Sequence, residues 1–135
     1  MASTGTNQVI GGGIGDSAVA TALAQRSWKV CLHEHASEID AIGAGIYLWG
    51  KGLATLEALG PYDDAVVGAH VGRSLESRNH NGRTVEHIEI NTPGQPGVKT
   101  NMREGLIGTL VDGATRAGVE IVTDSEVVSA TKPVR

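Results

Sequence analysis

Short apolar runs and turn residues alternate along the chain in a pattern that predicts an α/β fold. Residues 7–11 form an apolar run that ends in glycines, and residues 28–33 form a second run, so both are predicted to be buried strands. Between them, residues 14–26 carry apolar side chains at the helical period of 3.6 residues. This strand–helix–strand unit predicts two parallel strands joined by a crossover helix. The helix residues expected to face the core are Ala18, Val19, Ala22 and Leu23.

The middle of the chain is predicted to contain a helix followed by a β-hairpin. Residues 50–59 place leucines on one helical face, and Gly60 followed by Pro61 is typical of a helix end. Residues 66–77 and 84–90 have the pattern of strands on either side of a turn with an Asn-Gly dipeptide, which favours a hairpin.

A long helix and further strands are predicted in the last third of the chain. Residues 101–117 predict the helix, and Asn101 with Glu104 resembles a capping box at its start. Residues 119–122 predict a strand parallel to the first two, and residues 126–130 predict one more.

Composition narrows the function classes. A chain of 135 residues is long enough for one domain, which we expect to span residues 1–135. The net charge is −4 and no basic block stands out, which argues against nucleic acid and anionic membrane surfaces as partners. Cys31 is the single cysteine, so no internal disulfide can form. We expect a cytoplasmic location because no signal peptide or bilayer-spanning run is present, and the sequence leaves the oligomeric state open.

The clearest candidate for chemistry is the glycine cluster between the first strand and the first helix. The unpaired amides at a helix start bind anions, and glycine allows a phosphate group to approach the backbone closely. In a Gly-x-Gly-x-x-Gly pattern the three glycines would be Gly11, Gly13 and position 16, but position 16 is Asp16. Glu34 follows the second strand, about 20 residues further on, where a carboxylate can accept hydrogen bonds from a ribose hydroxyl.

Together these stretches resemble the N-terminal part of the FAD-dependent aromatic-ring monooxygenases, the family of para-hydroxybenzoate hydroxylase and salicylate hydroxylase. The resemblance covers nearly the whole chain, in order and with matching spacing. The residues that carry it are the loop Val9-Ile10-Gly11-Gly12-Gly13-Ile14-Gly15, Glu34, Gly43-Ala44-Gly45-Ile46, the helix at 53–60, Arg103, and Gly118-Val119-Glu120-Ile121-Val122.

The resemblance implies a Rossmann-like FAD-binding domain with a parallel sheet and an added β-hairpin. FAD would be the cofactor, NAD(P)H the reductant, and a small aromatic molecule the substrate into which one oxygen atom of O₂ is inserted. No side chain is identified as catalytic, and no metal ligand is expected. The implied cofactor-binding residues are Gly11, Gly13, Ile14 and Gly15 at the pyrophosphate, Glu34 and the adjoining His35 at the adenosine ribose, Gly43 and Gly45 near the flavin, and Arg103 at the flavin or pyrophosphate.

Three features depart from the family. Asp16 replaces the third glycine and places a carboxylate near the expected pyrophosphate, so we expect Asp16→Gly to tighten FAD binding. The helix at 101–117 contains three interior glycines, each of which costs about 1 kcal/mol relative to alanine, so this helix must depend on tertiary packing. The family also continues well past this length, which predicts a fragment or shortened form in which most of the substrate domain is absent.

Other hypotheses stay open at this point. A nicotinamide-dependent dehydrogenase domain would share the glycine loop but has no use for residues 42–46, and a non-catalytic nucleotide-binding remnant fits Asp16 and the missing segments. The glycine loop could also be an ordinary tight turn, Glu34 a solvated strand end, and Arg103 a surface residue of its helix.

Overall fold

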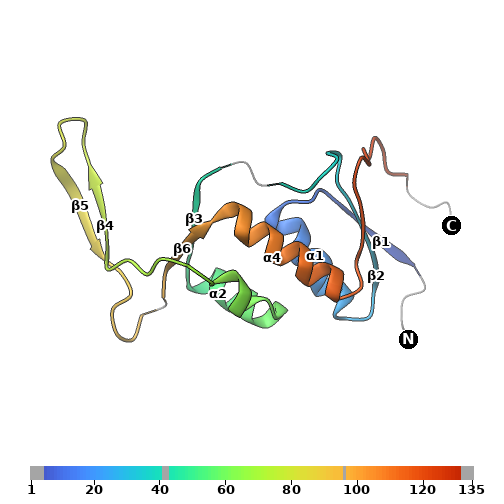
Figure 1. Ribbon diagram of the computed structural model, residues 1–135, viewed down its shortest axis with the longest axis horizontal. Coiled ribbons are helices and arrows are strands. Elements are labelled where there is room, and N and C mark those ends of the chain that lie inside the picture. Colours follow the sequence, from blue (N-terminus) through green and yellow to red (C-terminus); the bar gives the residue numbers. More distant parts are fainter. Residues whose placement is uncertain (1–4, 41–42, 96, 132–135) are drawn as a thin grey trace.

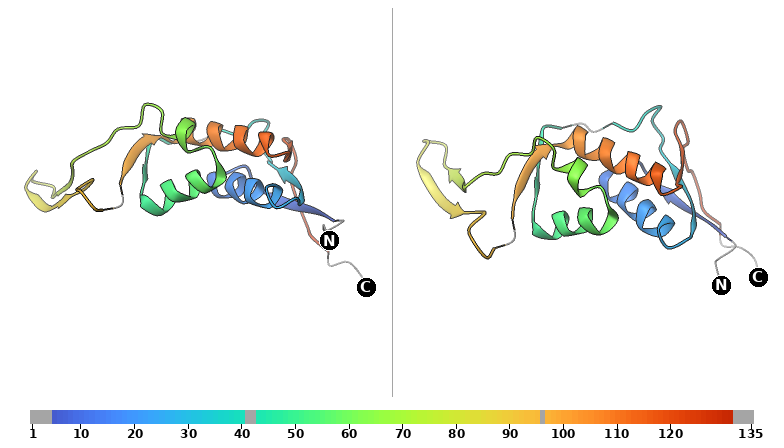
Figure 2. Two further views of the ribbon diagram at one scale, coloured as in Figure 1. Left: turned by 90° about the horizontal axis from the view of Figure 1, so that it is seen from below. Right: turned by 60° about the horizontal axis from the view of Figure 1, so that its bottom comes forward.

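The protein consists of a body of helices with a small sheet at one end and a β-hairpin that projects from the other end (Figure 1; Figure 2). The computed structural model describes residues 5–40, 43–95 and 97–131. Ile42, which begins the glycine-rich segment singled out in the sequence, therefore lies outside the described residues. Within these ranges, no helix is both long enough and apolar enough to cross a membrane.

A three-stranded parallel sheet forms the end of the body that carries the glycine loop. Its strands are β1 (Thr6–Ile10), β2 (Lys29–His33) and β7 (Glu120–Val122), with β2 in the centre. His33 is in register with both Ile10 and Val122, so all three strands end at the same edge of the sheet. The predicted parallel strands are confirmed.

Two helices cover one face of this sheet. α1 (Ile14–Ala24) connects β1 to β2, and α4 (Arg103–Arg116) precedes β7. The two helices lie against each other, and their small side chains meet the strands in one apolar cluster. The buried members of this cluster are Ala20, Val30, Leu32, Ala114 and Val119.

The predicted inner face of α1 was partly right, because Leu23 packs against this cluster, but the most buried positions differ from those predicted. The buried positions are Ser17, Ala20 and Thr21, and Val19 is 53% exposed. The reason is that α1 packs on the sheet and on α4 at once, which turns its most buried stripe toward the space between them.

The first half of α4 belongs to a second apolar cluster. There it meets β3 (Gly45–Leu48), α2 (Gly50–Leu59) and the short helix α3 (Tyr62–Ala65). The predicted helix at 50–59 is confirmed, including its end at Gly60, whose φ of 104° favours glycine. The buried members of the cluster are Leu48, Leu53, Leu56, Ala65, Leu106 and Leu110.

Several local predictions were wrong around this second cluster. β3 pairs antiparallel with β6 (Lys99–Met102), and neither strand was predicted because the two are far apart in sequence. Asn101 lies in β6 and does not cap α4; its side-chain amide instead donates to the carbonyl of Ala65 at 2.8 Å. The N-cap position of α4 is Met102, and α4 starts at Arg103.

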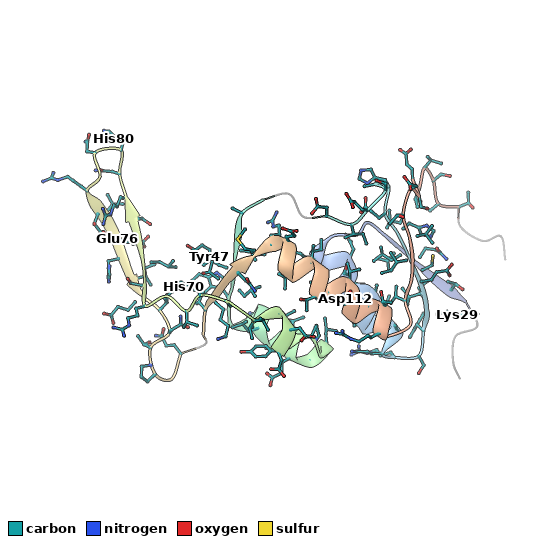
Figure 3. All side chains as sticks on the ribbon, in the orientation of Figure 1. Lys29, Tyr47, His70, Glu76, His80 and Asp112 are labelled. Carbon is teal, nitrogen blue, oxygen red and sulfur yellow. The ribbon has the colours of Figure 1, made fainter. Side chains whose placement is uncertain are left out.

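The β-hairpin is confirmed, but with a shorter first strand. It consists of β4 (Ser74–Arg78) and β5 (Thr84–Glu89), so the predicted strand character of residues 66–73 was wrong. The strand predicted at 126–130 is also absent. Glu76 and His80 lie on the projecting hairpin, well away from the body (Figure 3).

We expect the Leu106→Ala variant to lose about 2–5 kcal/mol of unfolding free energy, because Leu106 is 1% exposed in the second cluster and its truncation leaves a cavity. Val85→Ala, on the hairpin at 65% exposure, is the matched control and should change stability by less than about 0.5 kcal/mol. Urea unfolding followed by circular dichroism measures both. Equal losses in the two variants would contradict the assignment of the core.

Candidate nucleotide-binding site

The glycine loop lies at the edge where β1 and β2 end and α1 begins. Gly11 has a φ of 108°, a left-handed conformation that glycine adopts without strain, and its N–H donates to the carbonyl of His33 at 2.7 Å. This bond continues the pairing of the two strands into the loop. The loop is therefore fixed to the end of β2, where Glu34 follows.

Glu34 joins the glycine loop to the segment after β2. Its Oε2 accepts the Gly12 N–H at 2.8 Å, and its Oε1 accepts the Ala36 N–H at 2.9 Å. His35 Nδ1 lies 2.7 Å from Oε1, and the Glu34 side chain is only 13% exposed. The Ala36 N–H, followed by that of Gly12 and the charge of His35, holds the pKa of this carboxyl below its usual range against the opposing effect of burial. Glu34 is therefore ionised at neutral pH.

The two oxygens of the Glu34 carboxylate differ in their contacts. Oε1 accepts the Ala36 N–H and lies against His35 Nδ1, whereas Oε2 accepts the Gly12 N–H, and the backbone amide of His35 also favours the ionised carboxylate. Oε2 is the oxygen nearer the glycine loop. Glu34 also lines an open cavity of about 470 Å³, so a hydroxyl group could reach it. The cavity is lined by Gly12, Gly13, Glu34, His35, Ala36, Ser37, Glu38 and Asp40.

The first turn of α1 presents backbone donors beside this cavity. Among the hydrogen bonds of the described residues, none uses the N–H of Ile14 or Gly15, whereas the Ser17 N–H already bonds to Gly13. A side chain at Gly15 would meet open space, while the Ile14 side chain packs into the helical core. Ile14 could thus contribute only its backbone to a ligand.

Gly43, predicted near the flavin, and Arg103, predicted at the flavin or pyrophosphate, lie side by side. A Cβ on Gly43 would be 3.7 Å from Arg103 Nη1, and the Arg103 N–H donates to Ala44 at 3.1 Å. Gly43 also has a φ of 131°, which favours glycine. Gly45 lies in a β-strand, where it is paired with Met102 in the β3–β6 ladder.

A second open cavity, of about 670 Å³, adjoins the glycine-loop cavity. It lies between residues 38–40 and the first turns of α4, which begins at Arg103. Glu38 and Asp40 line both cavities, so the glycine-loop cavity and the α4 cavity adjoin. Of the predicted site residues, Gly13, Glu34 and His35 line the glycine-loop cavity, whereas Gly43 and Arg103 line neither of these two cavities.

Gly12 matters more than the sequence indicated. It was part of the motif but not among the predicted cofactor-binding residues. A Cβ on Gly12 would lie 2.8 Å from both Glu34 Oε2 and Ile39 Cγ1, so this position has no room for a side chain. The sequence did contain a sign of this, because Gly12 occupies a position that the Gly-x-Gly-x-x-Gly pattern leaves open to any residue and yet is glycine.

His33 is engaged by other side chains. Its Nδ1 lies 2.8 Å from Ser125 Oγ and its Nε2 lies 2.6 Å from Gln8 Oε1. Within residues 5–40, 43–95 and 97–131, no group of three or more potential metal-binding side chains occurs.

The chain is similar to known proteins in both sequence and fold. A probable 2-heptyl-3-hydroxy-4(1H)-quinolone synthase of Rhodococcus erythropolis is 48% identical over 121 residues, which are 90% of this chain and 32% of that protein. The tetrameric form of 2-methyl-3-hydroxypyridine-5-carboxylic acid oxygenase is 40% identical and superposes with a TM-score of 0.84, over 93% of this chain and 33% of that one. A probable FAD-dependent monooxygenase of Pseudomonas aeruginosa, 21% identical, has the same fold with a TM-score of 0.76, over 94% of this chain and 36% of that one. No protein-family model matches the chain.

These similarities confirm the predicted resemblance to the FAD-dependent aromatic-ring monooxygenases. They also confirm the fold class, an α/β domain with a parallel sheet and an added hairpin. The chain spans about a third of the length of the relatives that it matches.

We expect Gly12→Ala to destabilise the loop and Gly15→Ala to leave it intact. The added methyl group at Gly12 must push aside Glu34 or Ile39, whereas at Gly15 it meets nothing within 4 Å. The expected cost at Gly12 is about 1–3 kcal/mol of unfolding free energy. Thermal melts of both variants measure the difference. Similar melting temperatures for the two would argue against the close approach of Glu34 to the loop.

We expect Glu34→Gln to lose about 1–3 kcal/mol at pH 7, because the charged acceptor of two backbone donors is replaced by an amide. The folded pKa of Glu34 is depressed, so its stabilising effect is complete above about pH 4.3, the value for an unfolded glutamate, and is lost as pH falls through the folded pKa. The stability gap between wild type and variant should therefore narrow below about pH 4.3. Urea unfolding from pH 7 to pH 3 measures it; a constant gap would contradict an ionised Glu34.

Proposed function

We propose that residues 1–135 form the FAD-binding unit of a monooxygenase that hydroxylates a small aromatic molecule, with NAD(P)H as reductant. The observation that carries the proposal is the placement of Glu34. Its carboxylate is bonded to the glycine loop and lines a cavity beside the start of α1.

The residues present fit the adenosine diphosphate half of FAD. A ribose hydroxyl can donate to Glu34 Oε2, and the amides of Ile14 and Gly15 can donate to a phosphate oxygen at the positive end of the helix dipole. Glycine at position 12 lets Glu34 come close enough to the loop to hold this arrangement. The fit is good for the hydroxyl and backbone contacts, whereas Asp16 adds a negative charge close to the phosphates.

The remaining predicted residues suit the other half of the cofactor. Arg103 lies beside Gly43 at the start of α4, next to the second cavity, where its guanidinium could meet the flavin or a phosphate. The FAD group, when bound, would supply the redox and O₂ chemistry. The part of this chain would be to bind the cofactor, orient it and shape its surroundings.

The substrate class rests on the relatives. Their names specify a quinolone and a hydroxypyridine carboxylic acid, both nitrogen-containing aromatic rings that carry oxygen substituents. We propose a related small aromatic molecule for the whole protein of which this chain corresponds to about a third. A cytoplasmic setting fits the proposal, because Cys31 is the single cysteine and no internal disulfide can form.

Two other functions make different demands on the same site. A nicotinamide-dependent dehydrogenase would use the glycine loop and Glu34, but it would not need Arg103 to lie beside Gly43. A non-catalytic nucleotide-binding protein is favoured by one observation, the occupation of the Gly13 N–H by Asp16.

We expect the chain to bind one equivalent of FAD. We also expect ADP to bind at the same site, because Glu34 and the start of α1 would contact only the adenosine diphosphate part of FAD. Glu34→Gln should weaken both ligands at least about tenfold, since a hydrogen bond to a charged acceptor is worth about 1.5–3 kcal/mol. Arg83→Gln, at the hairpin turn, is the control and should bind as wild type. Quenching of flavin fluorescence and calorimetry measure the affinities.

Each of the competing functions has its own outcome in this titration. Binding of NAD but not of FAD would support a dehydrogenase. Binding of ADP with no preference for FAD would support a nucleotide-binding protein without flavin chemistry. Absence of binding by all three would overturn the proposed function.

A further inference from the structure

The three consecutive glycine amides of the loop are all engaged by acceptors from the protein itself. Gly11 donates to the His33 carbonyl at 2.7 Å and Gly12 donates to Glu34 Oε2 at 2.8 Å. Gly13 donates to Asp16 Oδ2 at 3.0 Å. A diphosphate that approaches this loop therefore finds three amide donors already bonded, whereas the next amides, of Ile14, Gly15 and Asp16, have no acceptor among the described residues.

The Asp16 carboxylate is folded back over the loop. The same Oδ2 that accepts the Gly13 N–H lies 2.7 Å from the place where a Cβ on Gly11 would be. The carboxylate is thus held between the two glycines that define the phosphate-binding motif. A negative charge is also favoured here by the N-terminal end of the α1 dipole, as it would be for a bound phosphate.

The three acceptors differ in how readily they can leave. The His33 carbonyl is part of the sheet, and Glu34 is held by a second backbone donor and by His35. Asp16 has the Gly13 N–H as the single hydrogen bond of its carboxylate among the described residues. Asp16 is therefore the acceptor that an incoming anion can displace at the lowest cost.

We propose that Asp16 is an internal anionic ligand of the glycine loop, which occupies the place of a phosphate oxygen at Gly13 and must be displaced when a diphosphate binds. The proposal rests on the proposed function, because it assigns Asp16 a role at the same site. Asp16 then sets the affinity of the loop for anionic groups: it lowers the affinity for diphosphates and leaves contacts with the uncharged nucleoside unchanged. Glu34, Glu38 and Asp40 line the adjoining cavity and keep their own charge effects in every Asp16 variant.

The test compares Asp16→Asn and Asp16→Gly with wild type. Asparagine keeps an acceptor for Gly13 but removes the charge, and glycine removes both. The control is Asp112→Asn, which removes a carboxylate from the exposed face of α4 (Figure 3). The probes are FAD, inorganic pyrophosphate and adenosine, titrated by calorimetry, with thermal melts to confirm that each variant is folded.

We expect FAD and pyrophosphate to bind Asp16→Asn at least tenfold more tightly than wild type, and Asp16→Gly at least as tightly as Asp16→Asn. Adenosine affinity and the Asp112→Asn control should be unchanged. A readout without any ligand is hydrogen exchange at the Gly13 amide, which should become at least tenfold faster in Asp16→Gly because its acceptor is gone.

The outcomes separate this inference from the proposed function. If FAD binds wild type and both variants equally, Asp16 has no such role and the proposed function stands. If no variant binds FAD but pyrophosphate still binds Asp16→Asn tenfold more tightly than wild type, the inference stands and the flavin function fails. If removal of Asp16 changes neither anion affinity nor Gly13 exchange, the inference is overturned.

Discussion

The structure depends most on the buried stripe of α4. Leu106 and Leu110 complete the cluster formed with β3, α2 and α3, and Ala114 completes the cluster on the parallel sheet. Three interior glycines weaken the helix by about 1 kcal/mol each, so its formation relies on these contacts. Because α4 belongs to both clusters, it also fixes the position of Arg103 relative to the sheet edge where the glycine loop lies.

At the candidate site, one side chain, that of Glu34, also joins separate segments of the chain. Glu34 bonds to the glycine loop and to the segment after β2, and the carbonyl and amide of Glu34 are themselves tied to Ser125 and Val122. The carboxylate is therefore a structural element as well as a potential ribose ligand. The Asp16 carboxylate accepts the N–H of the next glycine, Gly13, but through a single hydrogen bond. Because Glu34 is held by more contacts, we infer that an incoming anion displaces Asp16 and leaves Glu34 in place.

The parts of the fold that could be predicted are those governed by local pattern. The strand–helix–strand unit, the helix at 50–59 and the Asn-Gly hairpin follow from periodicity and turn residues. The β3–β6 ladder could not be predicted, because its partners are joined by a register that no local signal specifies. Asn101 looked like a cap but bonds to Ala65 instead. Glu34 and Asp16 were recognised by position, but their bonds to neighbouring glycine amides appear only in three dimensions.

The central claim is that the edge formed by the glycine loop and Glu34 is where the adenosine diphosphate part of a cofactor binds. Amide chemical-shift mapping by NMR during titration with ADP tests it most directly, because it locates the ligand residue by residue. We expect the largest shifts at Gly12 to Gly15 and at Glu34 and His35, with the hairpin residues 74–89 unchanged. Shifts confined to the hairpin, or to the apolar cavity that Ala18 of α1 and Leu59 of α2 help to line, would contradict the claim.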